Sequence, residues 1–289
     1  MKKVLLTMIF AVFAAVLVAC GSGDQGSKNE SQGNETKNEG ASETKTLNVG
    51  ASPVPHYEIL EQAKPLLKEK GIDLEVTEFT DYVLPNKSLE EKAIDANFFQ
   101  HEPYLKQQIA DNGYKFVSIG GVHIEPIGVY SKKYKSLDEL PDGATIIMSN
   151  SVADHGRMLS MLEEKGLIVL KEGVDKTAAT VEDIAENPKK LEFKADIEPA
   201  MLTKAYENDE GDAVLINGNF AMDAGLDPSK DSIALESPDN NPYVNLVVVR
   251  EGDENREEIK ALIEVLQSAE IQNWIKENYK GAVLPVKGE

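Results

Sequence analysis

The sequence predicts an α/β fold in which largely parallel sheets carry helices on both faces. Short apolar segments of strand length alternate with segments whose apolar residues recur every three to four positions, as they do along one side of a helix. This alternation favours parallel pairing, because a helix is the usual connection between two parallel strands. Hydrophobic residues make up 41% of the chain, which is enough for the core of one large domain or of two smaller ones.

The N-terminal segment predicts an export signal that ends at the only cysteine. Two lysines precede an apolar stretch of residues 4–18, which is shorter than the roughly 20 apolar residues that a membrane-spanning helix needs. Residues 17–20 read Leu-Val-Ala-Cys and resemble a bacterial lipobox. This resemblance implies that residues 1–19 are removed as a signal peptide and that Cys20 is lipidated. The alternative is an ordinary signal peptide with a buried, unmodified cysteine.

Residues 20–46 are predicted to form a disordered polar linker. After Cys20 they contain no aromatic and almost no aliphatic side chain, so they cannot bury enough surface to offset the entropy of ordering. Their Gly/Ser-rich composition is typical of a flexible spacer between a lipid anchor and a fold.

The charge of the chain limits its partners. Removal of residues 1–19 takes away two lysines, so the formal net charge changes from −20 to −22. A charge of this size argues against nucleic acid or anionic lipid as a main partner. Only Cys20 could enter a disulfide, so the stability of the fold is expected to come from its core.

The folded part is predicted to begin at Leu47. Gly71 ends the first predicted helix, and Pro103 suits the first turn of the third, where its missing N–H is not needed. In this first half we expect helices at residues 57–70, 89–94 and 104–112, and strands at residues 47–50, 74–79, 95–100, 115–119 and 127–131.

A second unit is predicted from residue 132. Gly166 ends the helix predicted at residues 156–165, and the Val-rich segment 243–250 is the strongest strand signal. We expect strands at residues 144–148, 213–216 and 243–250. Helices or helical turns are expected at residues 136–140, 156–165, 183–187, 198–207, 220–224, 255–268 and 270–279.

Polar and aromatic side chains follow several predicted strands, at the edge of the sheet where α/β proteins bind ligands. Arg157, in the first turn of a predicted helix, offers a planar fork for a carboxylate, and the helix N-terminus adds positive potential. Asparagine side chains can accept from an ammonium group or donate to a carboxylate. Tyr82, Phe99 and nearby histidines can frame an apolar group. The pattern predicts a pocket for a small zwitterion with an apolar tail.

Each of these residues also has a structural interpretation. Arg157 could lie on a helix surface, and His101 could cap the helix that follows it. Asn217-Gly218-Asn219 could form a turn only, since Asn-Gly is a common turn sequence. His56 is interpreted as structural, and His155 as a solvated helix residue.

Six segments at these positions resemble the NlpA-type, or MetQ, family of methionine-binding lipoproteins, the substrate-binding components of methionine ABC importers. The segments read VGASPVPH at 49–56, EFTDY at 78–82, DANFFQH at 95–101, VHIEP at 122–126, INGN at 216–219 and PYVN at 242–245. Several are long enough to be highly specific, and together they extend across the folded part of the chain. The lipobox is a further match.

The resemblance implies two α/β lobes of the type 2 periplasmic-binding-protein fold, each with a mostly parallel sheet, that close on a ligand. Lobe 1 would comprise residues 47–131 and 243–289, and lobe 2 residues 132–242. Arg157 would hold the carboxylate of methionine, Asn245 with Asn217 or Asn219 would hold its backbone groups, and Glu125 would assist the ammonium. The side-chain pocket would be lined by Tyr82, Phe99, His101, Tyr104 and His123.

One segment departs from the family pattern. The family usually reads Asn-Asp-Pro-Thr-Asn-Glu-Gly-Arg before the second-lobe helix, whereas residues 150–157 read Asn-Ser-Val-Ala-Asp-His-Gly-Arg. Asp154 therefore stands in place of an asparagine near Arg157. Its carboxylate could pair with Arg157 and weaken the hold on the ligand, or it could contact the ammonium. A methionine-containing dipeptide or another apolar amino acid remains an alternative ligand.

The sequence therefore predicts a lipid-anchored binding protein on the extracytoplasmic side of a cell membrane. It would deliver L-methionine to an ABC permease and its ATPase subunit, without a cofactor, metal or enzymatic activity. A surface hydrolase is the first alternative, but the sequence contains no Gly-x-Ser-x-Gly motif and no cysteine nucleophile besides Cys20. A metal-binding receptor using His56, His101, His123 and an acid is another, but the spacing is not that of a zinc site. An additional adhesion role stays open.

Overall fold

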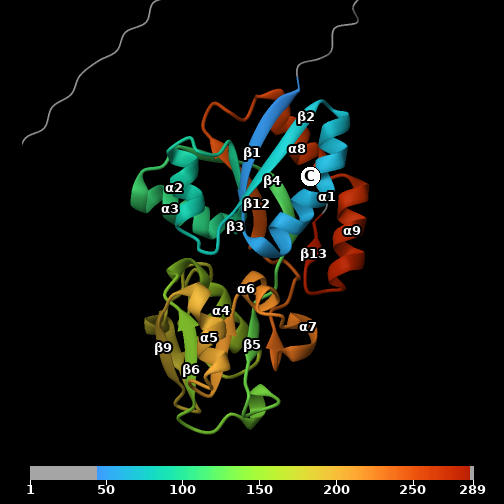
Figure 1. Cartoon of the computed structure of the whole chain (residues 1–289). Helices are drawn as coiled ribbons and strands as arrows, with labels where there is room; N and C mark the ends of the chain where they lie inside the picture. Colours follow the sequence, from blue (N-terminus) through green and yellow to red (C-terminus); the bar gives the residue numbers. More distant parts are fainter. Residues whose placement is uncertain (1–43, 287–289) are drawn as a thin grey trace, which may run out of the picture. The chain divides into compact units, whose positions relative to one another are not determined.

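The computed structural model describes residues 44–286 of the chain (Figure 1). The predicted signal peptide, Cys20 and the linker up to residue 43 lie outside the described residues. Strand β1 (Lys45–Ala51) begins inside the predicted linker, because Lys45 and Thr46 already pair with β2 (Ile72–Glu78). Within residues 44–286, no helix is long and apolar enough to cross a membrane.

The first sheet contains strands from both ends of the described chain. Its order is β13-β4-β12-β3-β1-β2, with β3 at Ala96–His101, β4 at Phe116–Ile124, β12 at Val244–Arg250 and β13 at Leu284–Pro285. The β1, β2 and β3 strands are parallel, whereas β12 runs antiparallel to both β3 and β4. The sheet is therefore mixed and not mostly parallel, because the returning strand β12 enters its middle.

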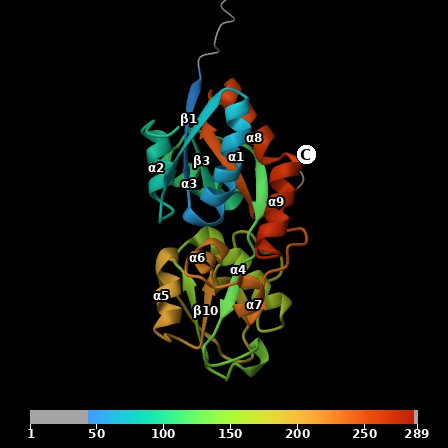
Figure 2. The same cartoon turned by 45° about the vertical axis from the view of Figure 1, so that its right-hand side comes forward.

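Helices cover both faces of this sheet, as the alternation of strand side chains requires. Val247 and Val249 of β12 belong to a core with helices α1 (Glu58–Glu69), α8 (Glu257–Leu266) and α9 (Ala269–Tyr279). Leu246 and Val248 point to the other face, where they pack with residues from α2 (Leu84–Glu90) and α3 (Glu102–Asn112). Two views of the chain show α1 and α9 on one side and α2 and α3 on the other (Figures 1 and 2). An irregular helical turn, Pro53–Tyr57, precedes α1.

The second sheet has the order β11-β5-β10-β6-β9 and is also mixed. Its strands are β5 (Gly128–Tyr130), β6 (Thr145–Ser149), β9 (Glu192–Ile197), β10 (Ala213–Ile216) and β11 (Ala234–Leu235). Two separate cores lie against it. Its helices are α4 (Val152–Glu164), α5 (Leu202–Glu207), α6 (Gly218–Asp223) and α7 (Pro228–Asp231). Short 3-10 turns lie at Leu137–Glu139, Val181–Asp183 and Pro199–Met201. Strands β7 (Val169–Leu170) and β8 (Ile184–Glu186) form a separate antiparallel pair.

The chain passes between the two sheets twice. It leaves the first sheet after Ile124 and enters the second at Gly128, and it returns between Leu235 and Val244. The first crossing lies a few residues before the predicted boundary at residue 131. The reason is that β5 pairs antiparallel with β10, which draws residues 128–130 into the second sheet.

Several local predictions differ from the structure. The helical turn expected at residues 183–187 is wrong, because residues 184–186 form strand β8. Helix α2 covers Leu84–Glu90 instead of residues 89–94, because Pro85 occupies its first turn. Helix α4 begins at Val152 and not at residue 156, so Asp154 lies in its first turn and Arg157 in its second. Strand β9 was not predicted. It is an edge strand whose successive residues alternate between exposed and half-buried, so its apolar pattern is weak.

Gly156 allows α4 to approach the following loop closely. A Cβ atom at this position would lie 2.2 Å from the backbone oxygen of Lys176, which cannot move without shifting the chain. We therefore expect Gly156→Ala to lower the free energy of unfolding by about 1–3 kcal/mol, the usual cost of overpacking. Urea denaturation measures this. The matched control Glu164→Ala, at an exposed position of α4, should change stability by less than about 0.5 kcal/mol, and equal effects of the two would contradict the argument.

Candidate functional site

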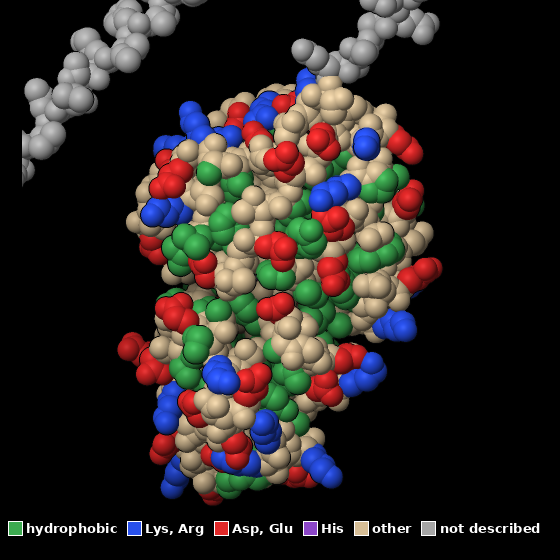
Figure 3. Space-filling view, viewed as in Figure 1, with side chains coloured by type: hydrophobic (Ala, Val, Ile, Leu, Met, Phe, Trp, Pro, Cys, Tyr) green, Lys and Arg blue, Asp and Glu red, His purple; other side chains and the backbone are tan. Residues whose placement is uncertain are grey.

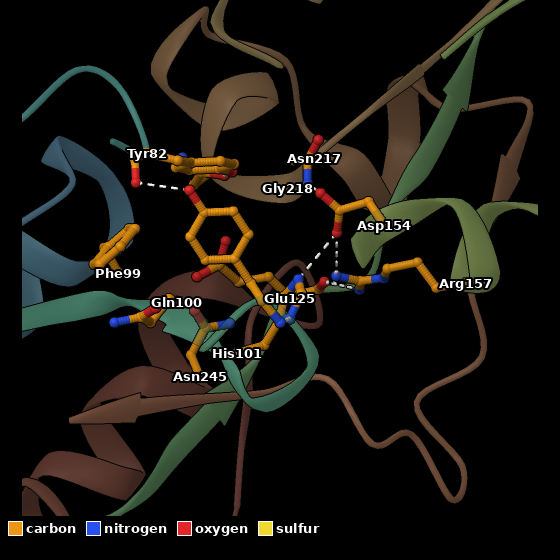
Figure 4. A pocket seen from close by; sticks show the side chains of 12 residues that line it. Tyr82, Phe99, Gln100, His101, Glu125, Asp154, Arg157, Asn217, Gly218 and Asn245 are labelled. Carbon is orange, nitrogen blue, oxygen red and sulfur yellow. Dashed lines mark hydrogen bonds and ion pairs between the residues drawn. The ribbon is translucent and has the colours of Figure 1, made fainter. Parts of the chain in front are cut away.

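A cavity lies where the two sheets face each other through their strand ends (Figure 4). The space between its lining residues is about 370 Å³, part of it open to solvent. The first sheet contributes residues at the ends of β3 and β12, and the second contributes residues from α4 and the segment after β10. The lining residues are Tyr82, Phe99, Gln100, His101, Tyr104, Glu125, Asp154, Arg157, Asn217, Gly218, Asn219 and Asn245.

Aromatic rings form one wall of the cavity. The ring centroid of Tyr82 lies 6.0 Å from that of Phe99, 5.9 Å from that of Tyr104 and 4.9 Å from that of Phe220. The Tyr104 hydroxyl donates to the backbone oxygen of Tyr82 at 2.8 Å, and the Tyr82 hydroxyl donates to Oδ1 of Asn219 at 2.6 Å. Burial raises the pKa of both tyrosines, so the wall is neutral. The aromatic rings of this wall can pack against an apolar group of a ligand.

The guanidinium of Arg157 is buried and largely occupied by protein groups. Its Nε lies 3.1 Å from one carboxylate oxygen of Glu236, its Nη2 also binds Glu236, and Nη2 donates to the backbone oxygen of Glu125 at 2.8 Å. The Tyr243 ring lies 4.5 Å from Cζ. Although burial by itself would lower the pKa of Arg157, Glu236 and Asp154 raise it, so the group stays charged. Only Nη1 remains on the cavity side, 3.9 Å from Asp154.

Asp154 connects α4 with the end of β3. Its Oδ1 lies 2.9 Å from Nε2 of His101, and its Oδ2 accepts from Nδ2 of Asn217 at 3.2 Å. Nδ1 of His101 accepts the backbone N–H of Tyr104, so the neutral ring carries its proton on Nε2 and donates to Asp154. Burial would raise the pKa of Asp154, but these donors, His101 first, lower it to about 2. Asp154 therefore binds His101 more closely than it binds Arg157.

Glu125 forms the floor of the cavity with Asn245. Its Oε1 lies 2.6 Å from Nε2 of His123 and 3.2 Å from Nε2 of His56, and the same nitrogen of His56 lies 3.0 Å from Oδ1 of Asn245. Burial raises the pKa of Glu125. Burial also lowers the pKa of His56 to about 4 and that of His123 to about 3, so both imidazoles are neutral at pH 7.

Nine of the ten residues predicted to bind the ligand line this cavity, and His123 does not. The side chain of His123 is fully buried behind Glu125. The same layer contains His56, which the sequence suggested as a structural residue and, in the metal-binding alternative, as a metal ligand. His155 is also buried and donates to the backbone oxygen of Ser149, so the expectation of a solvated residue is wrong.

Sequence reasoning missed Gln100, Gly218 and Glu236. A β-bulge explains the first of these: Gln100 pairs with Leu246 and Phe98 with Val247, so β3 has an extra residue at Phe99. The bulge breaks strict alternation and brings Phe99, Gln100 and His101 to the same cavity. Gln100 is then fixed by a buried amide network with Asn86 and Asn97. No sequence signal marks Glu236, which is far from Arg157 along the chain.

His56, His123 and Glu125 form a group that could hold a metal ion, because their ligand atoms lie within 4.8 Å of one another. His101, the third histidine of the metal hypothesis, pairs with Asp154 instead. Oε1 of Glu125 already hydrogen-bonds to Nε2 of His123 at 2.6 Å and lies 3.2 Å from Nε2 of His56, which hydrogen-bonds to Asn245.

Comparison with known proteins identifies the family of this chain. The model of the NlpA lipoprotein family matches residues 47–287. The chain belongs to the NlpA lipoprotein family.

A methionine-binding lipoprotein MetQ of Bacillus subtilis is 52% identical to this NlpA-family chain over 288 residues, which cover 99% of each chain. A solved nutrient-binding protein of Burkholderia cenocepacia, bound to methionine, is 42% identical with a TM-score of 0.78, and the match covers 83% of this chain and 99% of that one. A periplasmic substrate-binding protein of an ABC transporter from Coxiella burnetii is 38% identical with a TM-score of 0.77, over 83% and 100% of the two chains. These relatives agree with the predicted α/β fold of two lobes.

The buried imidazoles make the stability of this NlpA-family chain pH-dependent. In the unfolded chain His56 is protonated near pH 6.5, whereas in the folded chain its pKa is lowered to about 4. The contribution of His56 to the free energy of unfolding is therefore fully present above pH 6.5. It decreases by up to about 3 kcal/mol as the pH is lowered toward 4. In His56→Gln this contribution is absent, so the free energy of unfolding should decrease less between pH 7 and pH 4.5. Urea denaturation at both pH values tests this, and an equal decrease in both proteins would contradict it.

Proposed function

We propose that this NlpA-family chain is a lipid-anchored solute-binding protein that captures L-methionine and delivers it to an ABC importer. The observation that carries the proposal is the cavity between the two sheets, which combines a neutral aromatic wall with a buried polar floor. The relative from Burkholderia cenocepacia, solved with methionine, has the same fold over nearly its whole length.

In this proposal the methionine side chain lies against Tyr82, Phe99 and Tyr104. A thioether suits such a wall, because sulfur makes favourable contacts with aromatic rings. The polar groups of the ligand lie against the floor and α4, where Asn245, Asn217 and Nη1 of Arg157 are the candidate partners of the carboxylate. Glu125 and Asp154 are the candidate partners of the ammonium group. His123 acts from behind Glu125 and not as part of the pocket wall.

The proposal includes binding without turnover. Among the four histidines, His101 hydrogen-bonds to Asp154 and His155 to the backbone oxygen of Ser149. His56 and His123 are buried with depressed pKa values. None of the four imidazoles is exposed to solvent. Acidic and basic side chains are interspersed over the surface seen in Figure 3, which suits a domain that is held close to a membrane without adhering to it. Lipidation at Cys20 would raise its concentration beside the permease and ATPase subunits.

A methionine-containing dipeptide is the second candidate ligand. A groove continues outward from Tyr82 and Tyr104, which line both spaces, and it is bordered by polar residues including Asn150 and Glu198. A second residue of a peptide could extend into this groove.

The ligand is tested by thermal denaturation of purified protein from which bound ligand has been removed by partial unfolding and dialysis. L-Methionine at 100 times its dissociation constant should stabilise the protein by about 2.7 kcal/mol. D-Methionine, leucine, methionine dipeptides and zinc are measured in parallel. A stabilisation by dipeptides that far exceeds that by methionine would favour the second candidate. No stabilisation by methionine or its dipeptides would refute the proposed function.

Asn245 should be required for binding. Its amide lines the floor and hydrogen-bonds to His56, so Asn245→Ala removes a ligand partner without opening the apolar core. We expect the affinity for methionine to fall by at least about tenfold, as when a buried hydrogen bond to a charged group is lost. Isothermal titration calorimetry measures this, and circular dichroism checks that the variant is folded. An unchanged affinity would show that the ligand does not use Asn245.

Cys20 should serve only as an anchor. A Cys20→Ala chain is expected to lose attachment to the membrane, because acyl chains cannot be added, while it keeps its affinity for methionine. Cell fractionation followed by calorimetry of the released protein tests both parts. Loss of ligand binding in the released, folded protein would contradict this separation of roles.

A further inference from the structure

Two buried imidazoles lie directly beneath the floor of the cavity and do not line it. The ring of His56 packs edge-on against Phe98 at a centroid distance of 4.6 Å, and the ring of His123 packs edge-on against Phe98 at 5.2 Å. The two imidazole centroids are 4.9 Å apart. Both side chains are almost completely inaccessible to solvent. Their ring orientations are therefore fixed by packing.

The hydrogen-bond partners determine where the ring protons lie. In both rings Nε2 faces oxygen atoms: Oδ1 of Asn245 at 3.0 Å and Oε1 of Glu125 at 3.2 Å for His56, and Oε1 of Glu125 at 2.6 Å for His123. Nδ1 of each ring has no hydrogen-bond partner among the described residues. A neutral imidazole has one N–H group, and a proton on Nδ1 would leave the Nε2 lone pair facing oxygen. Both rings must therefore donate from Nε2.

This arrangement fixes the orientation of the Asn245 amide. Because His56 donates to Oδ1, that oxygen is held on the side away from the cavity as an acceptor. The Nδ2 group is then the part of the amide that is available to a ligand, as a donor to a carboxylate. An amide without this support can rotate and present its oxygen instead, which would repel a carboxylate.

The same layer supports Glu125, which lines the cavity from the next position along the floor. Its Oε1 receives the N–H of His123 and lies within reach of that of His56. The N–H of His123 behind the carboxylate favours its ionised form, against the effect of burial. The floor thus has a donor at Asn245 and an acceptor at Glu125, which suits the two charged groups of a zwitterion.

We propose that His56 and His123 are positioning residues whose neutral Nε2–H groups fix the polarity of the ligand site, with a donor at Asn245 and an acceptor at Glu125. The choice of methionine as probe rests on the proposed function, whereas the protonation of the rings does not. A divalent cation at the same three residues would need bare Nε2 atoms, so it is incompatible with this arrangement.

The protonation is tested first, by NMR of purified protein with ¹⁵N-labelled histidine. We expect His56 and His123 to give the signals of neutral imidazoles protonated at Nε2 between pH 6 and pH 8. Signals of the Nδ1–H form or of charged rings would overturn the proposal. So would zinc-induced stabilisation that is lost in His56→Leu. This measurement decides the proposal even if methionine proves not to be the ligand, in which case only the proposed function fails.

The effect on the ligand is tested by calorimetry of a double-mutant cycle with His56→Leu and Asn245→Ala. His56→Leu should weaken methionine binding at least about fivefold in the native background but less than about twofold when Asn245 is already alanine. It should also reduce the preference for methionine over methioninamide, which lacks the carboxylate. A role in packing only would give additive effects and an unchanged preference, and either result would overturn the proposal.

Two further variants guard against a general loss of folding. His56→Gln keeps an amide N–H toward Asn245, so it should retain more affinity than His56→Leu. If His56→Leu does not fold, His56→Gln and its double mutant with Asn245→Ala complete the cycle. The matched control is His155→Leu, which removes another buried histidine that binds a backbone oxygen and does not line the cavity. It should change methionine affinity by less than about twofold, and a loss equal to that in His56→Leu would overturn the proposal.

Discussion

The buried guanidinium of Arg157 holds together the segments on which the cavity depends. Through Glu236 it binds the chain where it leaves the second sheet, and through the backbone oxygen of Glu125 it binds the chain where it enters that sheet. Breaking a buried ion pair by removing one partner typically costs about 3–5 kcal/mol, because the remaining charge is left unpaired. The family pattern suggested that this arginine holds a ligand carboxylate. In the structure most of its donors are used by the protein, so its first role is to position α4 and both crossing segments.

Polar groups around the cavity are arranged in two layers. The inner layer faces the ligand space and consists of Asn245, Glu125, Asp154, Asn217 and Arg157. The outer layer hydrogen-bonds to it from behind and consists of His56, His123 and Glu236. Buried polar groups are costly unless they are paired, so the outer layer is what allows so many of them beside an aromatic wall. It also restricts each inner group to one orientation, which is the condition for selective binding of a small charged molecule.

The sequence predicted most of the fold because the two periodicities are clear in its core elements. Strand β10 occupies the predicted residues, and α1 and α9 differ from the prediction by about one residue at each end. Predictions were less accurate where tertiary contacts override local signals. The mixed sheets follow from the return of β12, and β9 is a polar edge strand. At the site, nine of the ten candidate residues line the cavity, and seven of these nine lie in short motifs beside strand ends. They could not separate His101, which lines the cavity, from His123, which lies behind it.

The family, the α/β class and the residue types that meet at the site follow from the sequence alone, which also predicts an export signal. These properties depend on composition, periodicity and contiguous motifs, all of which are local along the chain. Tertiary packing sets which of these residues face the ligand space and which support them. Asp154 pairs with His101 and not primarily with Arg157, Arg157 pairs with Glu236, and His56 orients Asn245. Each pair joins residues that are distant in sequence, and the choice among possible partners follows from packing and from the requirement that buried charges and donors be satisfied.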